Sequence, residues 1–166
     1  MFSFSRDKFK ISFSIESEAE LKSGLIRLEL KRATERTLNL MPLDVLVTKL
    51  IRPIPYTMGV YVVDEKTMRK LNKFYRKKDK TTDVLAFSRL EGVQMPFPEI
   101  GDIIICLPVA KAQANKAKIP LEMELRMLAI HGILHLFGYD HEKTKTEAKR
   151  MFSLQNQIVA SFTKRA

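Results

Sequence analysis

The chain has 166 residues, 45% of them hydrophobic and 29% charged, which is typical of a single globular domain (residues 1–166) and excludes a disordered or fibrous protein. Its 29 basic and 19 acidic residues give a formal net charge of +10, which favours association with a polyanion such as nucleic acid. No run of about 20 apolar residues and no signal-peptide core is present, and Cys106 is the only cysteine, so we expect a cytoplasmic protein with no disulfide and no membrane partner.

The N-terminal third is expected to contain strands and one long helix. Apolar and polar residues alternate at 10–15, which predicts a strand. Ser17 with Glu20 three residues later forms a capping-box pattern, so we expect a helix from there to about residue 40. Residues 45–51 are apolar and β-branched and predict a second strand, which Pro53 and Pro55 would end.

The remaining elements alternate between strands and helices. Further strands are predicted at 59–63, 84–87 and 101–107. Helices are predicted to begin at Asp64, Pro108, Pro120 and about Lys143. The segment 89–99 is a loop that we expect to border the functional site. The pattern predicts an α/β (α+β) fold, with a small mixed sheet of about four strands flanked by helices.

The helix expected after Asp64 is strongly basic. Between residues 66 and 80 there are eight basic residues and one acid, Asp79. Phe74 and Tyr75 lie among them, and an exposed aromatic ring there would suit stacking on a nucleic-acid base. The helical spacing instead favours a core role, in which Leu71 and Phe74 hold the helix to the core with Tyr75 beside them.

All three histidines lie within eleven residues, at 131, 135 and 141. His131 and His135 are four apart, so a helix places them on one face, about 5–6 Å apart. Gly138 is the residue best able to end that helix with a positive φ, which would turn His141 back toward the same point. Three neutral imidazoles leave the fourth position of a tetrahedral zinc ion open for water, as in catalytic sites.

A core histidine is the alternative interpretation for each of these residues taken alone. Burial of three imidazoles among apolar residues would be costly without partners, which favours metal binding for the group. We therefore expect one Zn²⁺ per chain, bound by His131, His135 and His141, and a catalytic metal is favoured over a purely structural one.

The histidine spacing equals that of the long metzincin protease signature. In that motif a glutamate follows the first histidine and acts as the general base. Here that position is Gly132, so the usual base of a metalloprotease is missing. The sequence therefore predicts a hydrolytic metal site with a different substrate class.

The same residues resemble the zinc motif of the YbeY family, bacterial endoribonucleases of rRNA maturation. The matching run is His131-Gly132-x-Leu134-His135-Leu136-x-Gly138-Tyr139-Asp140-His141. Two further blocks, at 71–87 and 101–105, are similar to conserved blocks of the family, so the motif-bearing part covers about residues 60–163. Lys77 stands where the family has a glycine, Ala86 and Ser88 stand where it has serine and proline, and residues 1–55 carry no family motif.

The resemblance implies a zincin-like fold and zinc-dependent, single-strand-directed RNA hydrolysis in 16S rRNA maturation and small-subunit assembly or quality control. It implies ribosomal RNA and the small ribosomal subunit as partners, with ribosomal proteins or an assembly GTPase as further ones. It also implies that Arg76 is catalytic or orients the substrate, with His131 as a metal ligand. The residue chemistry agrees, because a guanidinium binds phosphate bidentately and is always charged.

Four further side chains are candidates for the site. Lys78 and Lys80 are expected to contact RNA phosphates. Asp140, beside a ligand, and Asp102, at the start of a strand, are carboxylates that could orient a metal-bound histidine, although Asp102 also suits an ordinary turn. No general base is assigned.

Two other functions fit parts of the sequence. The basic helix also suits a ribosome-assembly RNA-binding factor whose metal is mainly structural. A metallopeptidase with a displaced base is a third hypothesis, which Gly132 disfavours.

Overall fold

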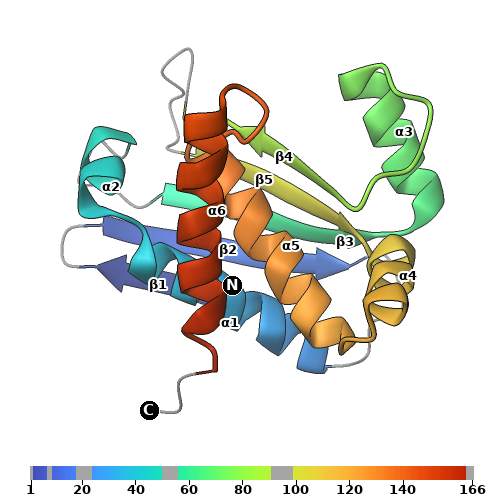
Figure 1. The fold of residues 1–166 in the computed structure, drawn as a ribbon, viewed down its shortest axis with the longest axis horizontal. Helices are drawn as coiled ribbons and strands as arrows, with labels where there is room; N and C mark the ends of the chain where they lie inside the picture. Colours follow the sequence, from blue (N-terminus) through green and yellow to red (C-terminus); the bar gives the residue numbers. More distant parts are fainter. Residues whose placement is uncertain (1, 7–8, 18–23, 50–55, 91–98, 164–166) are drawn as a thin grey trace.

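A mixed five-stranded sheet forms the centre of the computed structural model, which describes residues 2–6, 9–17, 24–49, 56–90 and 99–163 (Figure 1). The strands are β1 (Phe2–Arg6), β2 (Phe9–Ser17), β3 (Tyr56–Val63), β4 (Val84–Ser88) and β5 (Glu99–Cys106). Their order is β1-β2-β3-β5-β4, with β2, β3 and β5 parallel and the two edge strands antiparallel to their neighbours. The predicted α/β class is confirmed, and β1 is a strand that the sequence analysis did not predict.

Six helices are present in the described part of the chain. They are α1 (Gly24–Leu40), α2 (Leu43–Lys49), α3 (Glu65–Arg76), α4 (Leu107–Ala117), α5 (Leu121–Leu136) and α6 (Lys145–Ala160). The predicted starts at Asp64, Pro108 and Pro120 agree with this structure, since Asp64 and Pro120 are N-caps and Pro108 lies in the first turn of α4. None of these helices is both long and apolar enough to cross a bilayer.

Two predictions in the N-terminal part need correction. Residues 45–51 were expected to form a strand, but α2 occupies Leu43–Lys49 and places Leu46 in the core. A short apolar run cannot be distinguished from a buried helix by its pattern, and here packing on the core decides. Ser17 ends β2, the described part of α1 begins at Gly24, and Glu20 and residues 50–55 lie outside the described residues.

The two faces of the sheet carry different helices. Alternate residues of a strand point to opposite faces. On β3 and β5, Val60 and Ile103 pack in the main core with residues of α1, α5 and α6, whereas Val63 and Cys106 pack with Met68 of α3. The helices α5 and α3 therefore lie on opposite faces, and the edge strand β4 separates their ends.

The helix α3 is well capped at both ends. The Asp64 carboxylate accepts a hydrogen bond from the Thr67 amide (2.7 Å), and Lys77 ends the helix in the left-handed conformation, with φ 58°. Lys77 thus adopts the backbone conformation that favours glycine, the residue expected there from the family resemblance.

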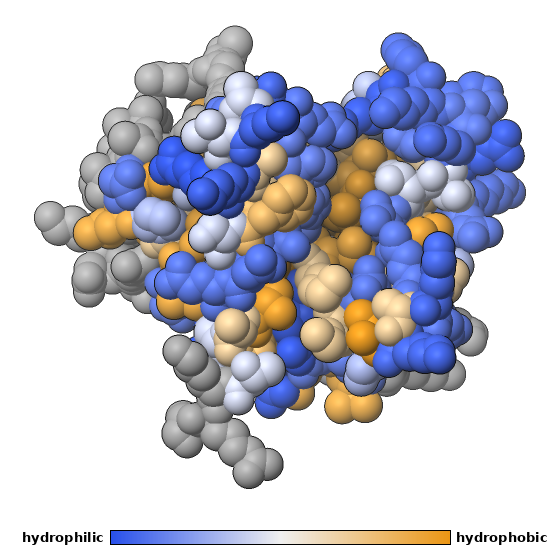
Figure 2. All heavy atoms as spheres, viewed as in Figure 1, coloured by the Kyte–Doolittle hydropathy of each residue, from blue (hydrophilic) through white to orange (hydrophobic). Residues whose placement is uncertain are grey.

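The expected core role of Phe74 and Tyr75 is wrong. Their side chains are 69% and 57% exposed, although Tyr75 follows the helical spacing of the buried Met68 and Asn72, and Phe74 lies three residues after Leu71, which packs on the core. The Tyr75 ring meets Phe87 of the edge strand β4 and Phe74 meets Tyr75, so each ring is covered on one side and most of its surface stays exposed. Figure 2 shows α3 and the following loop as a mostly hydrophilic lobe at the upper right.

Candidate metal centre

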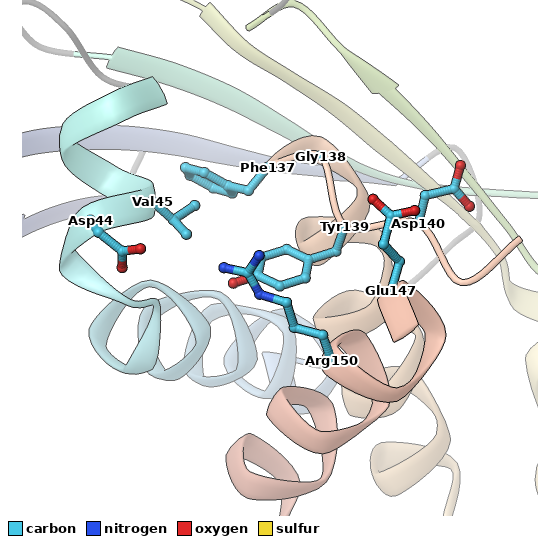
Figure 3. Close-up of a pocket in the computed structure, with 8 residues that line it drawn as sticks. All are labelled: Asp44, Val45, Phe137, Gly138, Tyr139, Asp140, Glu147 and Arg150. Carbon is cyan, nitrogen blue, oxygen red and sulfur yellow. The ribbon is translucent and has the colours of Figure 1, made fainter. Parts of the chain in front are cut away.

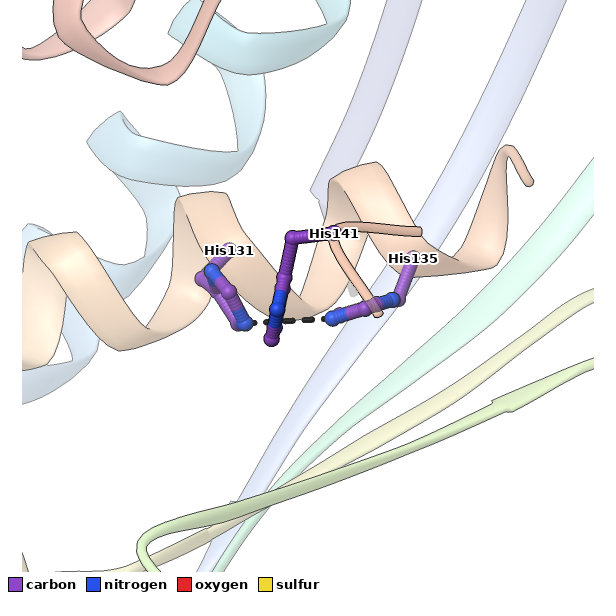
Figure 4. A group of neighbouring side chains, drawn as sticks. All are labelled: His131, His135 and His141. Atoms are coloured by element: carbon purple, nitrogen blue, oxygen red, sulfur yellow. Dashed lines mark hydrogen bonds between the residues drawn. The ribbon is translucent and has the colours of Figure 1, made fainter. Parts of the chain in front are cut away.

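The three histidines converge on one point (Figure 4). One nitrogen of each ring lies within 4.8 Å of those of the other two, and Nε2 of His131 is 3.1 Å from Nε2 of His135. Neutral imidazole nitrogens at such spacing suit a single transition-metal ion. His131, His135 and His141 are therefore a candidate metal-binding cluster.

The turn after α5 explains how His141 returns to the helix. The helix ends at Leu136, and Gly138 takes a φ of 90°, as the sequence predicted for this glycine. The Tyr139 amide donates to the Leu134 carbonyl (3.1 Å) and the Gly138 amide to the His135 carbonyl (3.0 Å). This pair of hydrogen bonds is the Schellman pattern, which reverses the chain sharply at a helix end.

Packing on the far side of the loop holds that turn in place. Phe137 and Tyr139 are buried, and Arg150 of α6 hydrogen bonds the Tyr139 hydroxyl. Figure 3 shows these side chains around a hollow of about 270 Å³ that lies between α2 and α6, with Asp44 across from Arg150. On the other side of the loop, the His141 ring stacks on Phe152 of α6, with centroids 5.4 Å apart.

Hydrogen bonds outside the cluster orient two of the rings. Nδ1 of His131 lies 2.9 Å from the side-chain oxygen of Gln155, and the His135 ring bonds to the Tyr139 backbone. Because the Gln155 oxygen only accepts, Nδ1 of His131 carries the proton and Nε2 keeps its lone pair. Such contacts fix the tautomer of a metal-binding histidine.

Burial, together with the adjacent His131 and His141 rings, lowers the pKa of His135 from 6.5 to about 4. His135 is therefore uncharged at neutral pH, which is the form that binds a metal ion. The negative charge of Asp140 acts in the opposite direction and raises the pKa of His135.

A cleft of about 340 Å³ opens in front of the histidines. All three histidines line one side, and Arg76, Lys78 and Lys80 line it from the end of α3 and the loop that follows. That loop is anchored by Asn72, a 3% exposed residue whose side-chain amide donates to the Lys80 carbonyl (2.8 Å). The structure thus brings the predicted metal ligands and the predicted basic residues to one cavity.

The basic residues of this region form two groups. Arg69 and Lys73, on the outer side of α3, bind the Asp79 carboxylate at 2.7 and 2.9 Å, and these contacts lower the pKa of Asp79 to about 2. By contrast, no carboxylate of the described residues forms an ion pair with Arg76, Lys78 or Lys80. The cleft therefore contains three cations that form no ion pair with a described carboxylate, although the acidic residues Asp83, Asp140 and Glu142 also line it.

The two candidate carboxylates differ in position. Asp140 lines the cleft, and its carboxylate accepts a hydrogen bond from the Glu142 amide (2.8 Å). Asp102 is not among the cleft residues, because it alternates with Ile103 on β5 and lies on the α3 side of the sheet, where its carboxylate pairs with Arg89 (3.0 Å). The structure therefore does not bring Asp102 to the histidines, and Gln155 occupies the orienting position that the sequence analysis considered for a carboxylate.

The glycine after the first histidine is required by packing. A Cβ at Gly132 would lie 2.9 Å from the Ile103 methyl and 3.4 Å from Val84. This position of α5 faces β4 and β5 at close range, so even a small side chain would force a shift. A glutamate, as in the protease motif, does not fit without movement of the helix or the sheet.

The fold and the histidine cleft together define a hydrolase with a candidate metal centre on a helix beside a mixed sheet. The family model of endoribonuclease YbeY matches residues 14–163, so this chain belongs to the YbeY family. The resemblance inferred from the motifs is thus confirmed, and the match extends into the N-terminal part where no motif was found.

Individual relatives agree with this assignment. Endoribonuclease YbeY of Sulfurihydrogenibium sp. is 44% identical over 106 residues, covering 64% of this chain and 70% of the relative. That of Aquifex aeolicus is 42% identical over 107 residues, covering 64% and 71%. The solution structure of TM1509 from Thermotoga maritima matches with a TM-score of 0.55 and 29% identity, covering 89% of this chain and 87% of that one.

Proposed function

We propose that this protein is a zinc-dependent endoribonuclease that cleaves single-stranded RNA. The observation that carries the proposal is the cleft in which three histidines share the lining with Arg76, Lys78 and Lys80. A Lewis acid at the phosphoryl oxygen and fixed positive charge near it both accelerate phosphodiester hydrolysis, and this cleft offers residues for both. The relatives are endoribonucleases by name, which supports RNA as the substrate.

The donor set fits zinc. Three imidazole nitrogens, two of them oriented by outer hydrogen bonds, are typical ligands of a zinc site with one open position. Zinc held there would lower the pKa of a bound water from 15.7 to about 7 and polarise a phosphoryl oxygen.

The chain's own side chains bind and position the RNA. The Arg76 guanidinium binds and orients the scissile phosphate, since it lines the cleft with the histidines and carries no carboxylate partner among the described residues. Lys78 and Lys80 hold neighbouring phosphates. Asn72 keeps this basic loop in place, so the charges are positioned before RNA arrives.

We further propose that the substrate is precursor ribosomal RNA, that the protein acts in the cytoplasm during 16S rRNA maturation, and that the small ribosomal subunit is its partner. The family membership supports this proposal. The strongly basic chain supports it as well, because rRNA is a polyanion.

Metal analysis and cleavage of a single-stranded rRNA precursor test the proposal. Wild-type protein should contain about one zinc per chain, and His131→Ala/His135→Ala should lose both the metal and the cleavage. Arg76→Ala should lower cleavage at least about 100-fold without loss of metal.

Arg69→Ala is the matched control, because Arg69 lies on the same helix but is paired with Asp79 outside the cleft. It should cleave at close to the wild-type rate. Retained cleavage in both the histidine and Arg76 variants would contradict the proposal. If the histidine variant loses zinc and unfolds, and the wild-type protein does not cleave RNA, the result would instead support a binding factor with a structural metal.

A further inference from the structure

Two aromatic rings stand exposed next to the cleft. Phe74 and Tyr75 occupy the last turn of α3, and Arg76, which lines the cleft, follows them directly. From this position we infer that Phe74 and Tyr75 form a stacking platform for unpaired bases of the RNA next to the scissile phosphate. The inference rests on the proposed function and names the part of the substrate that the chain recognises outside the metal centre.

The rings are held rather than free. The Tyr75 ring packs against Phe87 of β4, with centroids 4.8 Å apart, and Phe74 meets it edge-on at the same separation. Tyr75 nevertheless stays 57% exposed. A ring supported on one side and open on the other binds a planar ligand with little loss of side-chain freedom.

The edge strand β4 relates the rings to the cleft. Val84 and Ala86 face the α5 side of the sheet, where Ala86 lines the cleft, whereas Leu85 and Phe87 face the α3 side. Tyr75 rests on Phe87, so it lies on the α3 side, and Arg76 reaches the cleft on the other. A single-stranded RNA with one phosphate at Arg76 therefore crosses the edge of the sheet and places a neighbouring base at Tyr75.

The charges around the two rings indicate which ligand they bind. Lys77 places its ammonium 5.7 Å from the Phe74 ring centre, and Lys78 lines the adjacent cleft. The one acid of this segment, Asp79, is bound to Arg69 and Lys73. Aromatic rings interleaved with cations that form no ion pair with a described carboxylate suit single-stranded nucleic acid, whose bases stack while its phosphates pair with lysine and arginine.

This arrangement gives a preference for unpaired RNA. Bases of a duplex are already stacked and paired, so they cannot lie on Tyr75 without first separating. The platform thus favours single-stranded segments independently of the chemistry at the histidines.

Tryptophan fluorescence tests the platform directly. The chain contains no tryptophan, so Tyr75→Trp introduces a single reporter that keeps the stacking surface. An oligoadenylate of about 12 nucleotides should quench its emission on mixing, and a matched oligomer with abasic sites or a fully paired duplex should quench it far less. Equal quenching by the abasic oligomer, or no quenching by any oligonucleotide, would overturn the inference. Such a result would favour a protein as the partner of the two rings.

Substitutions provide the second measurement. Tyr75→Ala should weaken binding of the single-stranded oligomer and raise KM about 5- to 100-fold with kcat little changed, whereas Tyr75→Phe should behave like the wild type. Leu25→Ala, at an exposed apolar residue of α1, controls for loss of surface area.

Different results would contradict the proposed function and the stacking platform. Absence of RNA cleavage by the zinc-loaded wild type would contradict the proposed function, while the quenching result would still report on stacking. Wild-type binding and KM in Tyr75→Ala, with cleavage still dependent on Arg76, would contradict the platform alone.

Discussion

The side-chain oxygen of Gln155 lies 2.9 Å from Nδ1 of His131, so a residue of α6 decides which nitrogen of a residue of α5 faces the candidate metal position. Nε2 of His131 is left to meet Nε2 of His135 at 3.1 Å. The last helix of the chain is therefore part of the metal centre, although it supplies none of the three histidines.

Gln155→Leu should weaken metal binding about 10- to 100-fold, because the His131 ring loses the acceptor that fixes its tautomer and orientation. The affinity can be measured by competition with a chromophoric chelator. Gln155→Glu retains an acceptor at the same place and should bind the metal at least as tightly as the wild type. Equal affinity in the leucine variant would show that packing alone orients the ring.

Gly132→Ala should lower the free energy of unfolding by about 1–3 kcal/mol. The new methyl group would lie 2.9 Å from the Ile103 side chain, at a contact between α5 and the sheet that leaves no space. Urea unfolding measures the change. Gly24→Ala is the control, since nothing lies within 4 Å of a Cβ built there, and it should be close to neutral. A neutral result at both glycines would mean that Ile103 moves aside at no cost.

Lys77→Gly should raise the free energy of unfolding by about 1 kcal/mol, because Lys77 ends α3 with φ 58° and glycine adopts that conformation without strain. Lys70→Gly removes the same side chain from the exposed interior of α3 and should instead cost about 1 kcal/mol. Thermal or urea unfolding of the two variants gives the comparison. Destabilisation by Lys77→Gly would imply that the contact of the lysine with the Phe74 carbonyl outweighs the backbone strain.

The metal-free protein should lose stability as the pH falls from about 6.5 to about 4. The unfolded chain protonates His135 near its ordinary pKa of 6.5, whereas burial and the neighbouring histidines hold the folded pKa at about 4. Between these values the unfolded state binds more protons, so acid favours unfolding. Urea unfolding in chelator at about pH 7 and about pH 4.5 measures the loss, which His135→Gln should reduce. The same pH dependence in both proteins would assign it to other groups.

The histidine cluster was predictable because its signals are local. The spacing of His131 and His135 depends only on helix geometry, and the turn at Gly138 depends on one positive φ. Caps such as Asp64 and Pro120 are equally local, and the structure has them where the sequence indicated. The family motifs then indicated a class of enzyme that the family model confirms.

The failures share a dependence on tertiary contacts. Residues 45–51 have β-branched residues, but Leu46 is buried from a helix, α2, that packs on the core. Tyr75 follows the apolar spacing of α3, yet its ring meets the edge strand β4 at Phe87 and stays 57% exposed. Gln155 carries no sequence signal that distinguishes it from any polar residue of an amphipathic helix, since its role arises only when α6 packs beside α5.

Two of the three candidate ligands, His131 and His135, belong to α5, and the third, His141, belongs to the loop after it. That third ring stacks on Phe152 with an angle of 26° between their planes. The candidate ligand set is therefore divided between a helix and a loop, and the loop ligand is supported by an aromatic contact with α6. Loss of that one contact would free one ligand of the set and leave the two helical histidines in place.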